Sequence, residues 1–257
     1  MRLFSCPGGE ALSYEKSGQG VPLVLVHGSF SDHDTNWALL RPALEAHFTL
    51  YAVARRGRGQ TTCGPTLLAE ANDLAAFLVS LAEPVHLLGH SYGAQVALHA
   101  AAIAPSAIRK LVLYEPPWPH TTSAPVLARL QQRAAGSDWD GLAQDFFSQV
   151  LGLEPDEIAG LRSSDAWPFI VSDAEASLGD IMALCNHRFD PAAFRHLPVP
   201  VLLQVGTESP RDFFATDALA ANLPRVEIQD LPGQGHEAMN TAPQLYAEET
   251  ARFLQQQ

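Results

Sequence analysis

The sequence predicts an α/β protein with a mostly parallel, doubly wound sheet and an inserted helical segment. Two observations lead to this prediction. Short apolar runs rich in Val and Leu alternate with stretches of helical spacing, and the alternation breaks once over a long segment without a convincing strand. Nearly continuous apolar strands are typical of a sheet that helices cover on both faces. The repeated order of strand and helix then implies an open parallel sheet.

The expected elements follow one another along the whole chain. The strands are residues 23–26, 48–53, 85–88, 111–114, 201–205 and 226–229, and the helices of the sheet layer are residues 67–81, 95–104 and 243–254. Between the strands 111–114 and 201–205, four further stretches have helical patterns: residues 123–135, 139–151, 155–161 and 173–187. We therefore expect an α/β core formed by residues 1–116 and 191–257, and a helical cap formed by residues 117–190.

Composition and charge exclude several classes of protein. The 257 residues include 28 Asp and Glu against 16 Lys and Arg, so the formal net charge is −12. A negative surface repels phosphate backbones and anionic lipid, so we expect neither nucleic acid nor a membrane as a partner. With 47% hydrophobic and 17% charged residues, the chain can build a sizeable core. A small-molecule substrate is the expected partner, and no oligomeric state is indicated.

The cysteine count and the N-terminus indicate a cytoplasmic protein. Cys6, Cys63 and Cys185 are too few and too scattered for a disulfide framework, which favours a reducing compartment. The first residues lack the apolar region of a signal peptide. No run approaches the roughly 18 apolar residues that a membrane-spanning helix needs.

A candidate nucleophile lies directly after the expected strand 85–88. Gly89-His90-Ser91-Tyr92-Gly93 matches the pattern G-x-S-x-G between a strand and a helix. In that context a sharp turn presents the serine at the carboxyl edge of the sheet, and the flanking glycines are needed because a Cβ would collide with the turn. The pattern predicts Ser91 as the nucleophile.

A serine hydroxyl needs a base and an acid that orients the base. His236 is the predicted base, because it lies in a glycine-flanked loop after the last strand and so at the same sheet edge as Ser91. His86 falls in a strand and His99 in a helix, and His90 is expected to pack beneath the turn. The oxyanion of the intermediate needs backbone N–H donors. We expect these from Tyr92 and Ser29, with Phe30 as the alternative to Ser29.

The ordered motifs resemble the α/β-hydrolase superfamily over the whole chain. His27-Gly28, the stretch 55–59 (Arg-Arg-Gly-Arg-Gly), the serine motif and the loop 232–236 arrive in the order of that superfamily. The resemblance implies its fold and a hydrolase, but not a substrate, because one frame hosts many activities. A serine at the turn argues against the dehalogenase and epoxide-hydrolase branches, which use an aspartate there.

The acid departs from the superfamily's usual pattern. Most members place an Asp three residues beyond the glycine that ends the strand 201–205, and here that position is Ser209. A hydroxyl cannot stabilise an imidazolium as a carboxylate does. A subset of relatives places the acid after the preceding strand, where this chain has Glu115. We therefore expect Glu115 as the acid, with Glu208 and then Asp212 as alternatives.

Other polar clusters have simpler interpretations. Asp32-His33-Asp34 is not expected to bind a metal, because adjacent residues on a short loop seldom converge on one ion. The arginines of the stretch 55–59 lack the Lys-Ser/Thr of a phosphate-binding loop, and we expect them to pair with nearby carboxylates. Aromatic residues of the cap mostly hold it on the core, and some line the substrate pocket. The expected lining is Phe30, Trp118, Phe146, Phe147 and Trp167.

These residues predict a serine hydrolase that forms an acyl-enzyme. The expected substrate is a moderately sized, largely apolar carboxylic ester, thioester or lactone. We expect neither a cofactor nor a metal. Two alternatives use the same frame: a cofactor-free perhydrolase, haloperoxidase-like enzyme or lyase with the same triad, and a ligand-binding protein without chemistry.

Overall fold

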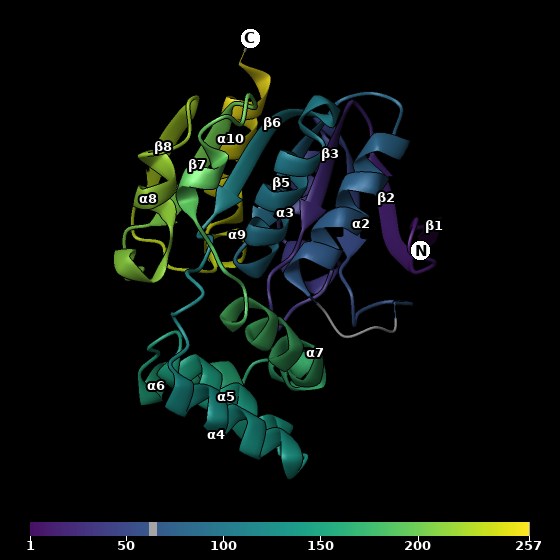
Figure 1. Cartoon of the computed structure of the whole chain (residues 1–257). Coiled ribbons are helices and arrows are strands. Elements are labelled where there is room, and N and C mark those ends of the chain that lie inside the picture. Colours follow the sequence, from purple (N-terminus) through teal and green to yellow (C-terminus); the bar gives the residue numbers. More distant parts are fainter. Residues whose placement is uncertain (62–65, 257) are drawn as a thin grey trace.

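The computed structural model describes residues 1–61 and 66–256, which form one eight-stranded sheet with helices on both faces (Figure 1). The sheet order is β1-β2-β4-β3-β5-β6-β7-β8. The pairs β1–β2 and β2–β4 are antiparallel, and the remaining pairs are parallel. The strands are β1 (Arg2–Ser5), β2 (Ala11–Gly18), β3 (Val21–Val26), β4 (Phe48–Ala54), β5 (Val85–His90), β6 (Ile108–Tyr114), β7 (Val201–Gly206) and β8 (Val226–Leu231).

The mostly parallel, doubly wound sheet is confirmed, and the six expected strands coincide with β3 to β8. The strands β1 and β2 were not predicted from the sequence. Only two of the eight residues of β2 are buried, so this strand lacks the continuous apolar run that marks the central strands. Antiparallel strands near a sheet edge have one solvated face, and their pattern is weaker for that reason.

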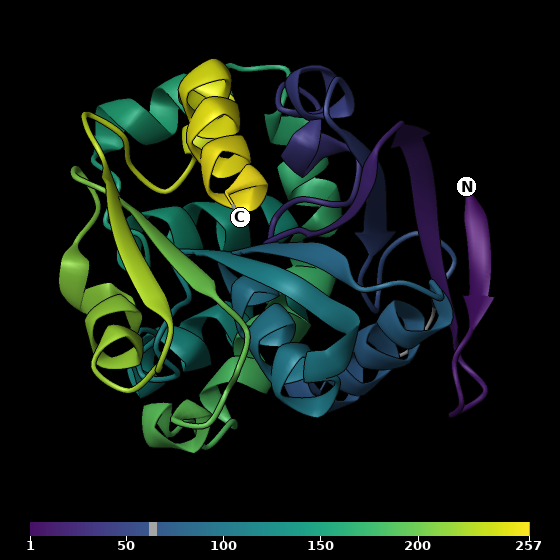
Figure 2. The same ribbon diagram turned by 90° about the horizontal axis from the view of Figure 1, so that it is seen from above.

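Helices cover both faces of the sheet (Figure 2). One face carries α2 (Leu67–Ser80), α3 (Tyr92–Ile103) and α8 (Thr216–Ala220), whose apolar residues pack on the sheet in one buried cluster. The opposite face carries α1 (Arg41–Glu45), α9 (Ala238–Thr241) and α10 (Pro243–Gln255). Short 3₁₀ turns are Thr35–Trp37, Pro105–Ala107, Pro191–Phe194 and Arg211–Phe213.

Four helices join β6 to β7 and lie beyond one end of the sheet (Figure 1). They are α4 (Ala124–Ala135), α5 (Trp139–Gln149), α6 (Pro155–Arg162) and α7 (Trp167–Cys185). These four helices form the cap. The division of the chain at residues 117 and 190 stays a prediction. Helix α7 begins at Trp167, before the expected start at residue 173, because Pro168 lies in the first turn, where its missing N–H costs no hydrogen bond.

The cap has an apolar cluster of its own, built around Leu130, Leu142, Trp167 and Ile170. Phe30, from the loop after β3, joins this cluster. Helix α7 lies between α4–α6 and the sheet (Figure 1), so it is the part of the cap that meets the loops at the sheet's edge.

Two further findings concern the cysteines and the membrane. Cys6 and Cys185 are free thiols, and Cys63 lies outside the described residues. Over residues 1–61 and 66–256, no helix is both long and apolar enough to cross a membrane.

The strand register brings the loops of interest to one edge of the sheet. Gly89 of β5 pairs with Val26 of β3, and Tyr114 of β6 pairs with His90 of β5. The loops that follow β3, β5 and β6 therefore leave the sheet side by side. The carboxyl ends of parallel strands are where open α/β sheets place their ligand sites.

Candidate active site

Ser91 lies in a strained turn between β5 and α3. Its backbone has φ 54° and ψ −125°, an unfavourable conformation that costs about 1–3 kcal/mol for a residue with a side chain. A Cβ on Gly89 would lie 2.6 Å from the Gly93 carbonyl oxygen, and one on Gly93 would lie 2.2 Å from the His27 carbonyl oxygen. Both flanking positions therefore exclude a side chain, for the steric reason that the motif implies.

Neighbouring strands support this turn. The Ser91 N–H donates to the Tyr114 carbonyl oxygen of β6 at 2.9 Å. Gly28 lies directly against the serine, because a Cβ built on Gly28 would lie 3.1 Å from the Ser91 Cβ. His90 is buried beneath the turn, as the sequence predicts, and its Nε2 donates to the His236 carbonyl oxygen at 2.9 Å.

Glu115 and His236 are in direct contact. Glu115 follows β6 with φ 48° and is fully buried. Its Oε2 lies 2.5 Å from His236 Nδ1, and its Oε1 accepts the Gly206 N–H at 2.8 Å. Both carboxylate oxygens thus have a donor. Burial alone would lower the pKa of His236, but the hydrogen bond and the charge of Glu115 raise it above its ordinary value.

The loop that carries His236 is held on several sides. The Tyr114 hydroxyl donates to the Gly235 carbonyl oxygen. The His236 ring stacks on Phe214, with ring centroids 5.3 Å apart and an interplanar angle of 12°. These contacts leave the imidazole little freedom to turn away from Glu115.

The alternative acids lie elsewhere. Glu208 is exposed, and its carboxylate accepts a hydrogen bond from Thr207 Oγ1 at 3.4 Å. Asp212 is also exposed. Within residues 1–61 and 66–256, neither carboxylate is hydrogen-bonded to His236.

Residues 27–30 form the loop from which one oxyanion donor is expected, and this segment is called the oxyanion loop below. The Phe30 N–H donates to Ser177 Oγ of α7 at 2.6 Å, so this alternative donor is already engaged. Among the described residues, the backbone N–H groups of Ser29 and Tyr92 have no hydrogen-bond partner. Of the three expected donors, Ser29 and Tyr92 therefore remain available, and Phe30 does not.

The arginines after β4 pair with carboxylates, as expected. Arg55 contacts Asp180, Arg56 contacts Asp73, and Arg58 contacts Asp173, each at 2.7–2.8 Å. Two of these aspartates, Asp173 and Asp180, belong to the cap, and this was not predicted from the sequence. Asp173, Ser177 and Asp180 are spaced i, i+4 and i+7 on α7 and so form a polar stripe along one side of the helix, and this spacing is the signal that could have revealed them.

The expected pocket residues divide into two groups. Phe30 contacts Phe146 and Phe147, with ring centroids 4.4 and 5.4 Å apart, and Phe147 contacts Trp167 at 6.3 Å. Trp118 lies apart from them, stacked on His120 and in edge contact with Phe189. The structure therefore brings four of the five aromatic residues together.

The Asp32-His33-Asp34 stretch forms a turn. Asp32 Oδ1 accepts the Asp34 N–H at 3.0 Å and the Thr35 N–H at 2.8 Å. No group of three or more metal-ligating side chains is found among the described residues.

Comparison with known proteins agrees with this geometry. Residues 23–251 match the alpha/beta hydrolase family, and the chain belongs to that family. A crystal structure of an alpha/beta hydrolase from Sphaerobacter thermophilus is similar, with a TM-score of 0.86 and 27% identity over 98% of this chain and 100% of that one. The chain thus has the fold of the alpha/beta hydrolases.

Two curated relatives carry the names of specific enzymes. The pimeloyl-[acyl-carrier protein] methyl ester esterase of Methylococcus capsulatus is 28% identical over 95% of this chain and 96% of its own. The N-formylmaleamate deformylase of Pseudomonas putida is 40% identical over 105 residues, which are 39% of each chain. The match to the deformylase therefore spans about two fifths of that enzyme.

Proposed function

We propose that the chain is a serine hydrolase that cleaves a carboxylic ester, thioester or lactone through an acyl-enzyme. The observation that carries the proposal is the contact between Glu115 and His236 at 2.5 Å, on the sheet edge where Ser91 lies in its strained turn. A buried carboxylate that orients an imidazole, at the same sheet edge as a half-buried serine in a sharp turn, is the arrangement that activates a hydroxyl.

The mechanism follows from these atoms. Ser91 Oγ attacks the carbonyl carbon while His236 Nε2 takes the hydroxyl proton, and Glu115 stabilises the resulting imidazolium through Nδ1. The N–H groups of Ser29 and Tyr92 bind the oxyanion of the tetrahedral intermediate. His236 then protonates the departing alkoxide or thiolate. Water attacks the acyl-enzyme, His236 takes its proton, and the acid leaves as Ser91 recovers its proton.

The cap supports an apolar substrate of moderate size. Phe30 stands beside the expected donor Ser29 and contacts Phe146 and Phe147 of α5. Aromatic side chains next to the reacting group favour an acyl chain that is apolar close to its carbonyl. Two of the relatives are named esterase and deformylase, so the substrates tested include both esters and amides.

The test is hydrolysis of activated p-nitrophenyl esters by wild type, Ser91→Ala and His236→Ala. We expect each variant to lose nearly all turnover and to keep the wild-type unfolding transition. Ser106→Ala and His47→Ala, which change an exposed serine and an exposed histidine, are the matched controls and keep wild-type rates. Retained activity in Ser91→Ala or His236→Ala contradicts the mechanism.

A second measurement separates the alternatives. A fluorophosphonate probe labels an activated serine, and a panel of esters, thioesters, lactones and amides measures turnover. Labelling of Ser91 with hydrolysis supports the proposal. Labelling without hydrolysis of any member favours the perhydrolase, haloperoxidase-like or lyase alternative, and absence of both favours a binding protein.

A further inference from the structure

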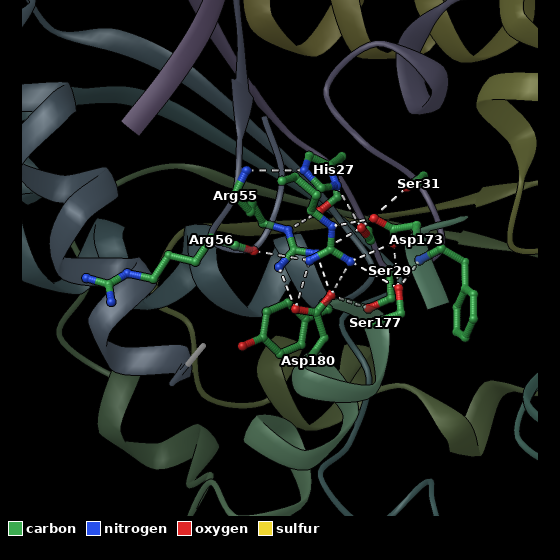
Figure 3. A network of polar contacts seen from close by, with 12 residues as sticks. His27, Ser29, Ser31, Arg55, Arg56, Asp173, Ser177 and Asp180 are labelled. Atoms are coloured by element: carbon green, nitrogen blue, oxygen red, sulfur yellow. Dashed lines mark hydrogen bonds and ion pairs between the residues drawn. The ribbon is translucent and has the colours of Figure 1, made fainter. Parts of the chain in front are cut away.

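A buried ionic network joins the oxyanion loop to helix α7 of the cap (Figure 3). Asp180 is fully buried between two guanidinium groups. Its carboxylate contacts Arg55 at 3.1 and 2.7 Å, and it contacts Arg58 at 3.0 and 2.8 Å. Burial alone would raise the pKa of Asp180, but the charges of Arg55 and Arg58 lower it, so the carboxylate stays ionised at neutral pH.

Arg55 holds the backbone of the oxyanion loop. Its Nε donates to the His27 carbonyl oxygen at 2.8 Å, and its Nη2 donates to the Gly28 carbonyl oxygen at 2.9 Å. His27 Nδ1 also donates to the Gly28 carbonyl oxygen, at 2.8 Å.

The position of that carbonyl determines where the next N–H points. In a trans peptide, the C=O of one residue and the N–H of the next point in opposite directions. Because the Gly28 carbonyl is directed at Arg55, the Ser29 N–H is directed away from Arg55. Gly28 itself lies against Ser91, so this peptide stands beside the nucleophile.

Helix α7 also contacts the two residues that follow. Ser29 Oγ donates to Asp180 Oδ2 at 2.8 Å, and the Phe30 N–H donates to Ser177 Oγ at 2.6 Å. The Ser177 hydroxyl is held in turn, since it accepts from Arg58 at 3.0 Å and donates to Asp173 at 2.6 Å. Phe30 has φ 56°, a left-handed conformation that a bulky residue keeps only where its surroundings hold it.

We propose that Arg55, Asp180 and Ser177 are positioning residues for the oxyanion hole. They hold residues 27–30 so that the Ser29 N–H is in place before the substrate arrives, and they do so without touching the substrate. Each of the four loop residues has at least one hydrogen bond to this network. This inference rests on the proposed function, because it assumes an oxyanion at Ser91.

The test compares two substrates with the same acyl group, an ester and its thionoester. Sulfur accepts hydrogen bonds poorly, so an oxyanion hole accelerates the ester far more than the thionoester. The variants are Ser177→Ala and Asp180→Asn. Ser172→Ala and Glu175→Gln, on the exposed side of α7, are the matched controls. We measure kcat and KM for both substrates.

We expect Ser177→Ala to lower kcat for the ester about tenfold, less than the 10²–10³-fold loss on removing a donor outright, with KM within about twofold. The thionoester rate changes little, so the ratio of ester to thionoester rates falls by about the same factor. Asp180→Asn shows the same pattern with a larger loss, and the controls keep the wild-type ratio.

Equal losses on both substrates, or an unchanged ratio, overturn the inference, because a merely structural role lowers both rates together. If Asp180→Asn does not fold, Ser177→Ala and Ser29→Ala together test the inference. Ser29→Ala removes the contact with Asp180 but keeps the backbone N–H of residue 29 and the Arg55–Asp180 pair. If wild type hydrolyses no ester and Ser91 takes up no fluorophosphonate, the proposed function fails and this inference fails with it. If Ser91 is labelled and active while the ratio is unchanged in Ser177→Ala, only this inference fails.

Discussion

Glu115 and His236, which are 121 positions apart in the sequence, meet at 2.5 Å on the carboxyl edge of the sheet. Glu115 is fully buried, and its other oxygen is bound by the Gly206 N–H, so the carboxylate cannot turn away from the imidazole. A carboxylate held in this way keeps His236 in the tautomer with the proton on Nδ1. In the proposed mechanism, that tautomer leaves Nε2 free to accept the proton of Ser91.

The first prediction concerns this carboxylate. Glu115→Gln keeps the shape of the side chain but removes its charge, so it no longer stabilises the imidazolium. We expect kcat for a p-nitrophenyl ester to fall about 10²–10⁴-fold. The matched variant Glu208→Gln changes an exposed carboxylate away from His236 and stays within about twofold of wild type. A larger loss in Glu208→Gln than in Glu115→Gln assigns the acid to Glu208 instead.

The second prediction is a pH dependence. Only neutral His236 can act as a base, so kcat/KM rises with pH as His236 loses its proton. Because Glu115 raises the pKa of His236, the midpoint of this rise lies above the ordinary histidine value of 6.5. Glu115→Gln removes the two larger contributions that raise the pKa of His236, so burial, which lowers it, outweighs the remaining charge of Glu237. The midpoint therefore moves to lower pH in that variant, and a pH profile of kcat/KM checks both positions. A midpoint that stays in place or moves upward contradicts the assignment.

The third prediction concerns the glycines. A Cβ on Gly93 would lie 2.2 Å from the His27 carbonyl oxygen and 2.4 Å from that of Val26, so the backbone must shift to admit it. Gly93→Ala is therefore expected to lower both the free energy of unfolding and the activity. Gly160→Ala is the control, because Gly160 lies in α6 with open space around it, and alanine there adds about 0.5–1 kcal/mol of stability. Urea denaturation measures the free energy of unfolding of both variants, and ester hydrolysis measures their activity. A stable, active Gly93→Ala contradicts the steric argument.

The parallel part of the sheet and most candidate residues of the site could be predicted from the sequence, for a physical reason. Parallel strands have strong continuous apolar patterns, and residues just after them share one edge of the sheet. Ser91, Glu115 and His236 each follow a strand, so their positions in the chain predict one shared edge of the sheet. Glu115 could be preferred over Glu208 only by resemblance, since the contact itself depends on how the loop 232–236 folds back over β6.

The role of α7 could not be predicted in this way. Asp173, Ser177 and Asp180 share one face of a helix, and the spacing shows that much. Which surface this face meets depends on the packing of the cap against the core, and local sequence carries no signal for that. The antiparallel strands β1 and β2 were missed for a related reason, because exposed edge strands lack a continuous apolar run.

The fourth prediction tests the aromatic cluster. Phe146 is half-buried and contacts Phe30 beside the oxyanion loop, whereas Phe169 of α7 is exposed. Phe146→Ala is expected to raise KM about tenfold for a p-nitrophenyl ester with a longer acyl chain, and less for the acetate, because the lost contact area grows with the chain. Phe169→Ala keeps wild-type values for both esters. Equal effects of Phe146→Ala on the two esters contradict an acyl-binding role.

The last prediction concerns stability. Asp180 is fully buried between Arg55 and Arg58, so Asp180→Ala leaves two guanidinium groups without their shared counter-charge. Breaking a buried pair in this way costs about 3–5 kcal/mol. The side chain of Asp217 is 63% exposed and pairs with Arg211 at 2.7 Å, and Asp217→Ala is expected to cost at most about 1 kcal/mol, because solvent screens that pair. Urea denaturation at neutral pH measures both variants. Similar costs for the two contradict this account of the network, since burial is the feature that distinguishes the two ion pairs.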